Sequence, residues 1–395
     1  MYDVAVIGGG PTGSHVAYRL AGMGYGVVVV EQKASLGEPV CCTGIISQEC
    51  ATSFAIDESV IWRRVNSARV LSPSGKRLNL WRPEPQACIV DRPAFNVALA
   101  NRAQAKGVEY LLNSPVRSIE VGNGGVSLET TYSGGRVNLL QARAAVLATG
   151  FSSPLIERLG FGKCGDFVGG VQAEIATTGV DEVEVYLGQA IAPAFFAWLV
   201  PTSPQRALVG LMSRRSPGLY LEKLISSLQA QGKIASASAK FSYGGIPLKP
   251  LARTCSDRLI VVGSAAGQVK PTTGGGIYYG LLCADIAADT LHRALDNDTL
   301  SARNLANYER EWKKKLGKEL KVGYWARKLY ESLSDNQVNR LFEIINSNGI
   351  DKALLQADDL SFDWHGGVVL KLMGHQVLAK AIDGVKIPFT RRGRG

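Results

Sequence analysis

Short apolar runs followed by glycine-rich segments occur near the start of this chain and again in its later half. Residues 3–7 have the pattern of a short buried strand, and after a glycine-rich turn and a helical stretch, residues 27–30 form a second apolar strand. The same order returns where the apolar strand 259–262 precedes the glycine-rich segment 263–277 and an apolar stretch of small residues, 278–288. The chain therefore contains two strand–loop–helix units far apart in the sequence, which indicates an α/β fold.

Between these two units, alternating apolar and polar residues predict a second, antiparallel sheet. A hairpin is expected over residues 66–81, around the turn Ser72-Pro73-Ser74-Gly75. Four more strands and a helix follow along the chain, at 171–175, 183–187, 195–200, 207–212 and 219–231. Turns at 122–125 and 133–135 predict a three-stranded meander whose last strand, 144–147, returns to the first sheet.

Helices are expected after the first loop, in the middle of the chain and at its end. Asp91-Arg92-Pro93 opens a helix, with proline in its first turn. From about residue 296 onward the pattern is mostly helical, and 304–320 is the clearest amphipathic segment. These last helices suit either the closed end of an apolar tunnel or a dimer surface.

The first glycine-rich segment, Gly8-Gly9-Gly10-Pro11-Thr12-Gly13, has the spacing of a dinucleotide-binding turn. Gly8 allows the tight turn, Gly10 lets a pyrophosphate approach the backbone, and Gly13 lets the helix pack closely on the strand. Glu31 ends the second strand, where an acid accepts hydrogen bonds from an adenosine ribose. Because strand, helix, second strand and acid are all in register, we predict dinucleotide binding; the alternative is a purely structural turn.

The late segment 263–277 carries five glycines, so few side chains keep a ligand away from its backbone amides. It delivers N–H groups to a helix N-terminus, which suits an anionic or carbonyl-rich partner. We expect the two loops to share one ligand, and together they favour FAD over NAD. The first loop would hold the pyrophosphate and adenosine. The late loop would reach the ribityl chain and the flavin, where amides of residues 274–277 stabilise the negative charge of the reduced ring.

The two loops and the intervening sheet predict the domain organisation. We expect a Rossmann-like FAD-binding domain, interleaved with an antiparallel-sheet substrate domain and followed by a helical C-terminal region. The FAD-binding domain would be discontinuous, at 1–65, 82–165 and 246–295. The substrate domain would comprise 66–81 and 166–245, and the helical region 296–395. A chain of 395 residues is longer than one hydrophobic core usually supports, which agrees with this division.

Composition indicates a soluble cytoplasmic enzyme. No run approaches the 18 or so apolar residues that a membrane span needs. The first strand begins at once, which leaves no room for a signal peptide, and seven cysteines, an odd number, argue for thiols over a disulfide framework. Adjacent Cys41 and Cys42 make poor metal ligands and the four histidines are not clustered, so we expect no metal.

The net charge of +10 is unevenly placed. Residues 313–328 hold seven basic residues against one acid, Glu319. The C-terminal tail adds four basic residues, Lys386, Arg391, Arg392 and Arg394. These segments are either solvated helix faces and a frayed tail or a surface attracted to anionic lipid headgroups, which would place the protein peripherally on the cytoplasmic membrane face. No recognition motif accompanies the charge, so we expect no nucleic-acid partner.

The order of motifs resembles the p-hydroxybenzoate-hydroxylase-type FAD superfamily. The motifs that carry this resemblance are Gly8–Gly13, Glu31, Pro39-Val40-Cys41-Cys42-Thr43-Gly44, Asp91-Arg92, Ala148-Thr149-Gly150 and Gly263–Ile277. Within it, the chain resembles the geranylgeranyl reductase family, which saturates isoprenoid double bonds. Three further patterns narrow it to this family: Pro39-x-x-Cys42-x-Gly44, Pro193-x-x-Phe196-x-Trp198-x-x-Pro201, and Tyr308-x-x-x-Trp312 followed by Gly317-Lys318-Glu319-Leu320. The resemblance covers at least residues 2–325.

The resemblance implies a reductase that saturates C=C bonds of a geranylgeranyl or other polyprenyl chain by hydride transfer from N5 of reduced flavin. It implies FAD contacts from Gly8, Gly10, Gly13, Glu31, Gln32, Thr43, Gly44, Arg92, Val116, Ser264, Gly276 and Ile277. From its sequence context alone, Arg92 is equally a surface charge. Position 264 departs from the family, which usually has aspartate there to bond a ribityl hydroxyl; serine keeps a hydrogen bond without the charge, at a cost of about 1 kcal/mol.

For the substrate, the resemblance implies a pocket wall of Phe196 and Trp198, to which we add Tyr186, whereas Phe195 is expected in the core. An apolar, aromatic wall suits an isoprenoid lipid without polar handles. Cys42 lies near the flavin by resemblance and is a weak catalytic candidate; its alternative is a small buried hydrophobe. The proton source stays open between Cys42, Tyr186 and water. No second nucleotide motif identifies the electron donor, which is therefore open between NAD(P)H and ferredoxin.

Three other functions share parts of this pattern. A flavin monooxygenase would use the same FAD frame with a polar pocket. A flavin halogenase carries a W-x-W-x-I-P strand, which 196–201 resembles without the first tryptophan. A basic lipid-binding flavoprotein that only relays electrons is the non-enzymatic alternative. Only the reductase adds two hydrogens per double bond to a polyprenyl chain, so product analysis separates them.

Overall fold

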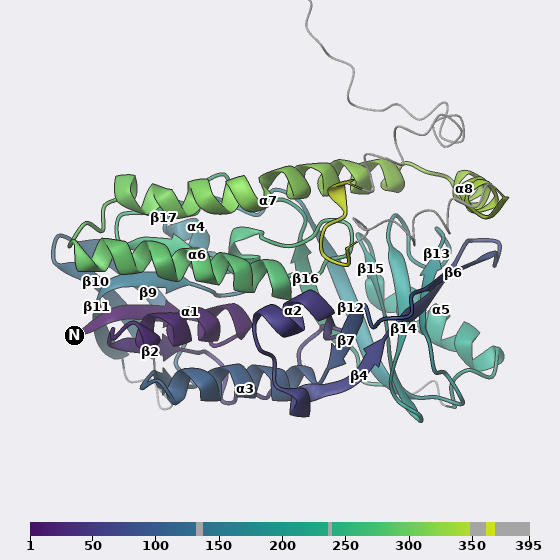
Figure 1. The fold of residues 1–395 in the computed structure, drawn as a ribbon, viewed down its shortest axis with the longest axis horizontal. Helices are drawn as coiled ribbons and strands as arrows, with labels where there is room; N and C mark the ends of the chain where they lie inside the picture. Colours follow the sequence, from purple (N-terminus) through teal and green to yellow (C-terminus); the bar gives the residue numbers. More distant parts are fainter. Residues whose placement is uncertain (132–136, 236–238, 348–360, 368–395) are drawn as a thin grey trace, which may run out of the picture. The chain divides into compact units, whose positions relative to one another are not determined.

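The computed structural model describes residues 1–131, 137–235, 239–347 and 361–367. By compactness the chain divides into two units (Figure 1). Unit 1 consists of Met1–Trp62, Cys88–Val168 and Gly244–Leu320, and unit 2 of Arg63–Ala87, Gly169–Tyr243 and Lys321–Gly395. The predicted turn 133–135 and the four basic residues of the tail lie outside the described residues.

Unit 1 is built on a mainly parallel sheet with the strand order β17-β18-β11-β1-β2-β8. Its strands are β1 (Tyr2–Ile7), β2 (Val27–Val30), β8 (Glu109–Leu111), β11 (Val137–Leu147), β17 (Cys255–Ser256) and β18 (Leu259–Val261). β1 pairs in parallel with both β2 and β11, and β11 pairs in parallel with β18, so residues 2–30 and 259–261 lie in one sheet. The predicted α/β fold is confirmed.

The predicted meander is present, and its third strand continues into the parallel sheet. β9 (Val116–Gly122) and β10 (Gly125–Thr131) pair antiparallel, and β10 pairs antiparallel with the first half of β11. The second half of β11 then runs parallel to β1, from Ala142 to Leu147. One strand of eleven residues therefore serves both arrangements, where the sequence predicted only its last four residues in the nucleotide sheet.

The parallel sheet is covered on both faces. Ala5 and Ile7 of β1 belong to an apolar cluster with Val126 and Leu128 of the meander. The intervening residues of β1 point to the other face, where α1 (Pro11–Gly22) packs on β1 and β2. α1 lies between α3 (Arg92–Gln104) and α6 (Ile277–Asp296), so three helices form one layer (Figure 1). Asp91 caps α3 by accepting from the N–H of Ala94, as expected for a helix opened by Asp-Arg-Pro.

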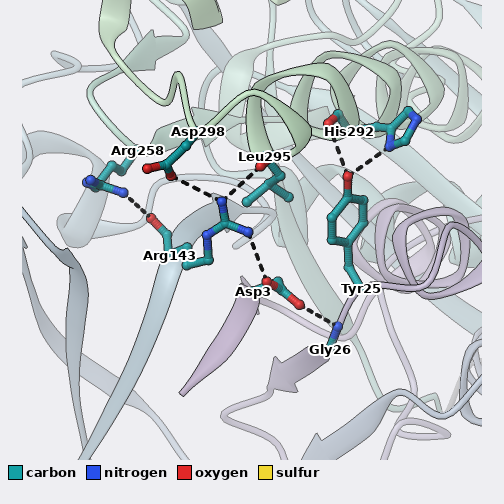
Figure 2. A network of polar contacts seen from close by, with 8 residues as sticks. All are labelled: Asp3, Tyr25, Gly26, Arg143, Arg258, His292, Leu295 and Asp298. Atoms are coloured by element: carbon teal, nitrogen blue, oxygen red, sulfur yellow. Dashed lines mark hydrogen bonds and ion pairs between the residues drawn. The ribbon is translucent and has the colours of Figure 1, made fainter.

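A polar network ties the N-terminal edge of this sheet to α6 (Figure 2). Arg143 of β11 donates to the Asp3 carboxylate at 3.2 Å, to the Leu295 carbonyl at 2.8 Å and to Asp298 at 3.1 Å. The other oxygen of Asp3 accepts from the Gly26 N–H at 2.9 Å. The network thus joins β1, β11 and the end of α6 on the side of the sheet away from the glycine loops.

Unit 2 is built on the second predicted sheet, with the order β16-β12-β15-β14-β13-β5-β6. Its strands are β5 (Ser67–Leu71), β6 (Arg77–Trp81), β12 (Phe167–Ala176), β13 (Val183–Leu187), β14 (Phe196–Ser203), β15 (Arg206–Ser213) and β16 (Ser242–Pro247). The predicted hairpin β5–β6 and the four predicted strands are present. β5 pairs in parallel with β13, which joins the hairpin to the sheet.

The two faces of this sheet have different covers. One face packs on α5 (Pro217–Ala230), whose Leu221, Leu224 and Leu228 share one apolar cluster with Ala197 and Leu199 of β14. Toward β5 and β6 the other face meets α8 (Asp335–Ser347), through a small cluster that includes Phe342 and Leu187. Phe195, expected in the core, is buried and precedes the first residue of β14.

Between residues 302 and 347 the chain is mostly helical, as the sequence predicted. α7 (Ala302–Glu331) extends beyond the predicted 304–320 at both ends. The division between the two units falls within α7, and also within β4 (Ile61–Val65), β7 (Ala87–Val90), β12 and β16. The first part of α7 therefore belongs to unit 1 and the rest to unit 2.

Candidate functional site

The first glycine loop joins β1 to α1, and its three motif glycines have different roles. Gly8 has φ +108°, and a Cβ there would lie 2.4 Å from the Ala148 carbonyl oxygen. A Cβ on Gly13 would lie 2.0 Å from the Gly8 carbonyl oxygen. Gly10, the N-cap of α1, would place its Cβ in open space with no atom within 4 Å. Packing within the protein thus requires glycine at positions 8 and 13. At position 10 the protein itself leaves room for a side chain.

That space is a cleft of about 410 Å³ in unit 1, within the size range of small-molecule sites. Its wall combines the first loop with the ends of neighbouring strands. The lining includes Gly8, Gly9, Gly10, Glu31, Gln32, Arg92, Asn96, Ser114, Val116, Thr149 and Gly150. Six of the predicted cofactor-binding residues, Gly8, Gly10, Glu31, Gln32, Arg92 and Val116, therefore line one cleft.

Two buried polar atoms in the wall of this cleft lack a hydrogen-bond partner. Arg92 is only 8% exposed; its Nη1 donates to Asn96 Oδ1 at 2.7 Å, while its Nε has no partner. The hydroxyl of Thr149 is likewise unpartnered. Leaving such groups unsatisfied costs about 1–3 kcal/mol each, so the wall suits a ligand that brings acceptors. FAD, with its pyrophosphate and ribose oxygens, fits this requirement.

Glu31 faces the cleft but already holds two backbone donors. Its Oε2 accepts from the Gly9 N–H at 2.6 Å and its Oε1 from the Lys33 N–H at 2.9 Å. An ionised carboxylate has about four acceptor positions, so Glu31 retains capacity for ribose hydroxyls. The acid that the sequence predicted as a ribose ligand therefore also fixes the first loop to the segment after β2.

The late glycine loop packs directly on the first loop. It runs from β18 through a short 3₁₀ turn, η2 (Gly263–Ala266), to α6. Cβ atoms on Gly263 and Gly280 would lie 2.9 Å and 2.4 Å from the Thr12 hydroxyl oxygen. A second, smaller cavity of about 30 Å³ is lined by Ser264 and shares Phe151, Ser152 and Ser153 with the cleft. The two loops therefore border adjoining cavities, as a single extended ligand requires.

A buried chain of hydrogen bonds braces the late loop. The Gln268 side chain accepts from the Gly263 N–H at 2.7 Å and donates to the Tyr308 hydroxyl at 2.8 Å. Tyr308 in turn donates to the Val261 carbonyl at 2.9 Å, and Trp312 donates to Thr254 Oγ1 at 2.9 Å. In the sequence, Tyr308 and Trp312 served only as family motifs, and Gln268 was not predicted. A glutamine directly after the small residues Gly263–Gly267 was the signal that could have found it.

Four other predicted cofactor residues, Thr43, Gly44, Gly276 and Ile277, do not belong to the lining of either cavity. Gly44 has φ +69°, and its Cβ would lie 2.9 Å from Arg92 Cγ, so glycine there lets the loop pass over the arginine. Thr43 and Cys42 precede it on the same loop. Burial, and then the neighbouring Cys42, raise the pKa of the Cys41 thiol to about 12. Gly276 and Ile277 form the N-terminus of α6.

The predicted aromatic wall lies in unit 2, and the structure separates its members. Trp198 pairs with Val185 and Phe196 with Leu187, whereas Tyr186 pairs with Ala197. Residues directly opposite in an antiparallel pair share a face, and neighbours along a strand alternate. Phe196 and Trp198 therefore share one face, with ring centroids 6.0 Å apart, and Tyr186 lies on the opposite face, in the core under α5. Tyr186 cannot line the same wall as the aromatic pair.

Tyr186 instead belongs to a buried charge network. Its hydroxyl donates to Glu184, which also accepts from Lys233 at 2.5 Å and from Arg69 at 3.1 Å. Burial and the Glu184 carboxylate raise the pKa of Tyr186. The sequence could not predict this network. Alternation places Phe196 and Trp198 on one face of their own strand, but it does not determine which face Tyr186 occupies on the neighbouring strand.

Trp198 lies flat on the sheet because residue 210 is glycine. A Cβ on Gly210 would lie 2.5 Å from Trp198 Cζ2. The indole Nε1 is buried and has no hydrogen-bond partner. The backbone at Gly210 thus supports the Trp198 ring, whose one polar atom, Nε1, makes no hydrogen bond.

Candidate acid–base and metal groups are few in the described part of the chain. His15 contacts Asp285 at 2.8 Å and His292 contacts Tyr25 at 2.8 Å, both within the helix layer of unit 1. No group of three or more His, Cys, Asp or Glu among the described residues is arranged to hold a metal ion. No helix in the described ranges is both long and apolar enough to cross a bilayer.

Comparison with known proteins agrees with this geometry. The family model described as Lycopene cyclase protein matches residues 3–344. A digeranylgeranylglycerophospholipid reductase 2 of Methanothermobacter thermautotrophicus is 31% identical over 363 residues, 88% of this chain and 93% of the relative. A geranylgeranyl bacteriochlorophyll reductase-like protein from Thermoplasma acidophilum superposes with a TM-score of 0.84 at 24% identity, covering 96% of this chain and 98% of that one. A mutant of the halogenase PltM in complex with FAD superposes with a TM-score of 0.69 at 13% identity, covering 96% of this chain and 91% of that one.

The fold is that of the FAD-dependent oxidoreductases, and the match over residues 3–344 places the chain in the lycopene cyclase protein family. The likeness to the halogenase rests on the fold alone. With a 31% identical relative along nearly its whole length, the chain belongs to the geranylgeranyl reductase family. This confirms the family that the sequence motifs indicated.

Proposed function

We propose that this protein binds FAD in the cleft of unit 1 and saturates C=C bonds in the polyprenyl chains of a glycerophospholipid. The observation that carries the proposal is the cleft beside Gly10, with its unpartnered Arg92 and Thr149 atoms, in a chain of the geranylgeranyl reductase family. When bound and reduced, FAD supplies the hydride for an alkene carbon.

Different residues of unit 1 would bind different parts of the cofactor. Gly10 leaves room for the pyrophosphate, and Glu31 and Gln32 stand beside the ribose. Arg92 offers a buried cation, which Gly44 allows to lie beneath the loop that carries Thr43. Ser264 would reach the ribityl chain, and the N-terminus of α6 at Gly276 and Ile277 would direct its amides at the ring. The brace through Gln268 and Tyr308 keeps the late loop in place for this contact.

On the substrate side, we propose Phe196 and Trp198 as the apolar wall and leave Tyr186 out. Both rings lie on the sheet face opposite the α5 core and are neither fully buried nor fully exposed. A prenyl chain offers only apolar surface, so aromatic rings suit it. Cys42 and water remain as proton sources, since the Tyr186 hydroxyl is bonded to Glu184.

The test is reduction of a digeranylgeranylglycerophospholipid by purified, FAD-loaded protein under anaerobic conditions, with dithionite as the reductant. Mass spectrometry should show a gain of two hydrogens for every double bond saturated. A lipid that returns unchanged, while the flavin is fully reduced, would refute the proposal. Repeating the assay with NADH, NADPH or reduced ferredoxin in place of dithionite identifies the physiological class of donor.

A second function follows from the family model, which is described by a cyclase name. A cyclase acting on a polyprenoid would rearrange its substrate without changing its elemental composition. The same mass spectrum therefore separates the two: a cyclised product keeps the substrate mass and loses a double bond, whereas a reduced product gains hydrogen.

We also propose that the exposed lysines of α7 attract the protein to an anionic membrane surface where such lipids reside. Lys314, Lys315 and Lys318 are exposed, whereas Lys313 pairs with Glu309 at 2.5 Å. Each cation near such a surface contributes about 1 kcal/mol. Co-sedimentation with phosphatidylglycerol vesicles should fall on replacing these three lysines with glutamine and in high salt. Equal binding to neutral vesicles would refute this proposal.

A further inference from the structure

A buried guanidinium near the start of β14 has more hydrogen-bonding capacity than its surroundings use. Arg327, on the part of α7 that belongs to unit 2, has a side chain only 4% exposed. It lies over the ring of Phe195, 3.8 Å from the centroid, and over the ring of Tyr330 at 4.7 Å. Aromatic faces stabilise a cation, so the two rings hold the guanidinium plane in a defined place.

The unused donors are on two nitrogens of Arg327. Neither Nε nor Nη2 has a hydrogen-bond partner, although both are buried. The nearest charge is the Glu331 carboxylate, whose Oε1 lies 3.8 Å from Nε, beyond hydrogen-bonding distance. The guanidinium fork matches two oxygens of one phosphate or carboxylate group. Arg327 therefore presents unused N–H groups that could bind an oxyanion. The Glu331 carboxylate comes close to these N–H groups but does not accept a hydrogen bond from them.

Other cations surround the same carboxylate. Arg214 donates to Glu331 Oε1 at 2.7 Å, and Lys328 donates to Oε2 at 3.1 Å. Glu331 thus lies beside three cations, and one of them, Arg327, donates no hydrogen bond to it. Burial lowers the pKa of Arg327 to about 10, with Arg214 also lowering it, so the guanidinium remains charged at neutral pH. A group with more negative charge and more oxygens than one carboxylate would satisfy this cluster better.

We propose that Arg327, with Arg214 and Lys328, binds the phosphate group of the lipid substrate, which takes the place that the Glu331 carboxylate now occupies. This rests on the proposed function, because it assigns a site for the phosphate of that same substrate. Phe195, which covers Arg327, immediately precedes Phe196 of the proposed apolar wall, and its carbonyl accepts from Tyr330 at 3.1 Å. The phosphate site and the prenyl wall would therefore begin at consecutive residues, Phe195 just before β14 and Phe196 within it.

The experiment compares two matched substrates with the FAD-loaded enzyme and dithionite: a digeranylgeranylglycerophosphate lipid and the same lipid without its phosphate. For Arg327→Met, KM for the phosphorylated lipid should rise about tenfold or more, as expected for loss of a charge-assisted pair. KM for the neutral lipid should change less than about twofold on the same scale. Arg327→Lys, which keeps the charge but loses the fork, should fall between. Glu331→Gln should lower KM for the phosphorylated lipid only, because it removes the competing carboxylate.

Inorganic phosphate tests the site without any substitution. It should raise KM of the wild-type enzyme for the phosphorylated lipid and leave the neutral lipid unaffected. Equal inhibition with both lipids would mean a free-anion site unrelated to the headgroup and would overturn the proposal, as would Arg327→Met raising both KM values alike. Melting temperatures of the variants identify a loss of fold. If the wild type reduced neither lipid, the proposed function would fail, whereas reduction of both with equal KM would refute only the phosphate site.

Discussion

Replacing Gly10 by valine tests cofactor binding without disturbing the fold, because among the glycines of the first loop only Gly10 has open space where a Cβ would lie. Its backbone, at φ −71° and ψ 179°, is an extended conformation that valine adopts readily. No atom lies within 4 Å of the added Cβ. The only structural cost is at the N-cap of α1, where a branched apolar residue is worse than glycine by about 1 kcal/mol. We therefore expect Gly10→Val to fold, with a slightly lower melting temperature for the apoprotein.

The effect on FAD should be much larger. The valine side chain would stand where the pyrophosphate approaches the loop, so one or two charge-assisted hydrogen bonds from backbone N–H groups would be lost. Each is worth about 1.5–3 kcal/mol, and about 1.4 kcal/mol is a tenfold change in Kd. We expect FAD affinity to fall at least about tenfold and the purified protein to lose its yellow colour.

The assay is a fluorescence titration of the apoprotein with FAD, together with its melting temperature. Gly13→Val is the matched contrast: its Cβ would lie 2.0 Å from the Gly8 carbonyl oxygen, so it should lower both stability and FAD binding. If Gly10→Val kept full FAD stoichiometry with unchanged affinity, the pyrophosphate would lie elsewhere and the role given to residues 8–13 would be wrong.

Three further changes test other parts of the site. Ser264→Asp should tighten FAD binding several-fold, because a charged acceptor bonds a ribityl hydroxyl more strongly; unchanged or weaker binding in a titration would place Ser264 away from the ribityl chain. Trp198→Ala should retain FAD but change which double bonds are reduced, whereas a large fall in melting temperature with an unaltered product pattern would indicate a core role. Burial opposes ionisation of Glu184, but hydrogen bonds from Lys233 and Tyr186 outweigh it and hold its pKa below the ordinary 4.5. Its stabilisation is therefore present above that pH and lost as the pH falls through the lowered value, so Glu184→Gln should flatten the dependence of melting temperature on pH below about 4.5; a parallel shift at all pH values would contradict this.

The sequence predicted those features whose cause is local. Glycine spacing after an apolar strand, an acid at the end of the next strand and proline in a first helical turn each depend on neighbouring residues, so the first loop, Glu31 and the start of α3 were found. The hairpin β5–β6 was found for the same reason, since its turn residues set its register. The family was recognisable because its motifs recur in order along the chain.

Tertiary structure alone decided which distant residues share a place. Tyr186 was predicted in the same pocket wall as Phe196 and Trp198, yet strand pairing places it on the other face. Gln268 and Tyr308 are forty residues apart in the sequence but form a hydrogen bond that braces the late loop. Arg327 lies over the ring of Phe195, although the two are 132 residues apart. Alternation along a strand fixes relative faces within that strand, but register between strands and contacts between remote elements depend on packing, which no local pattern encodes.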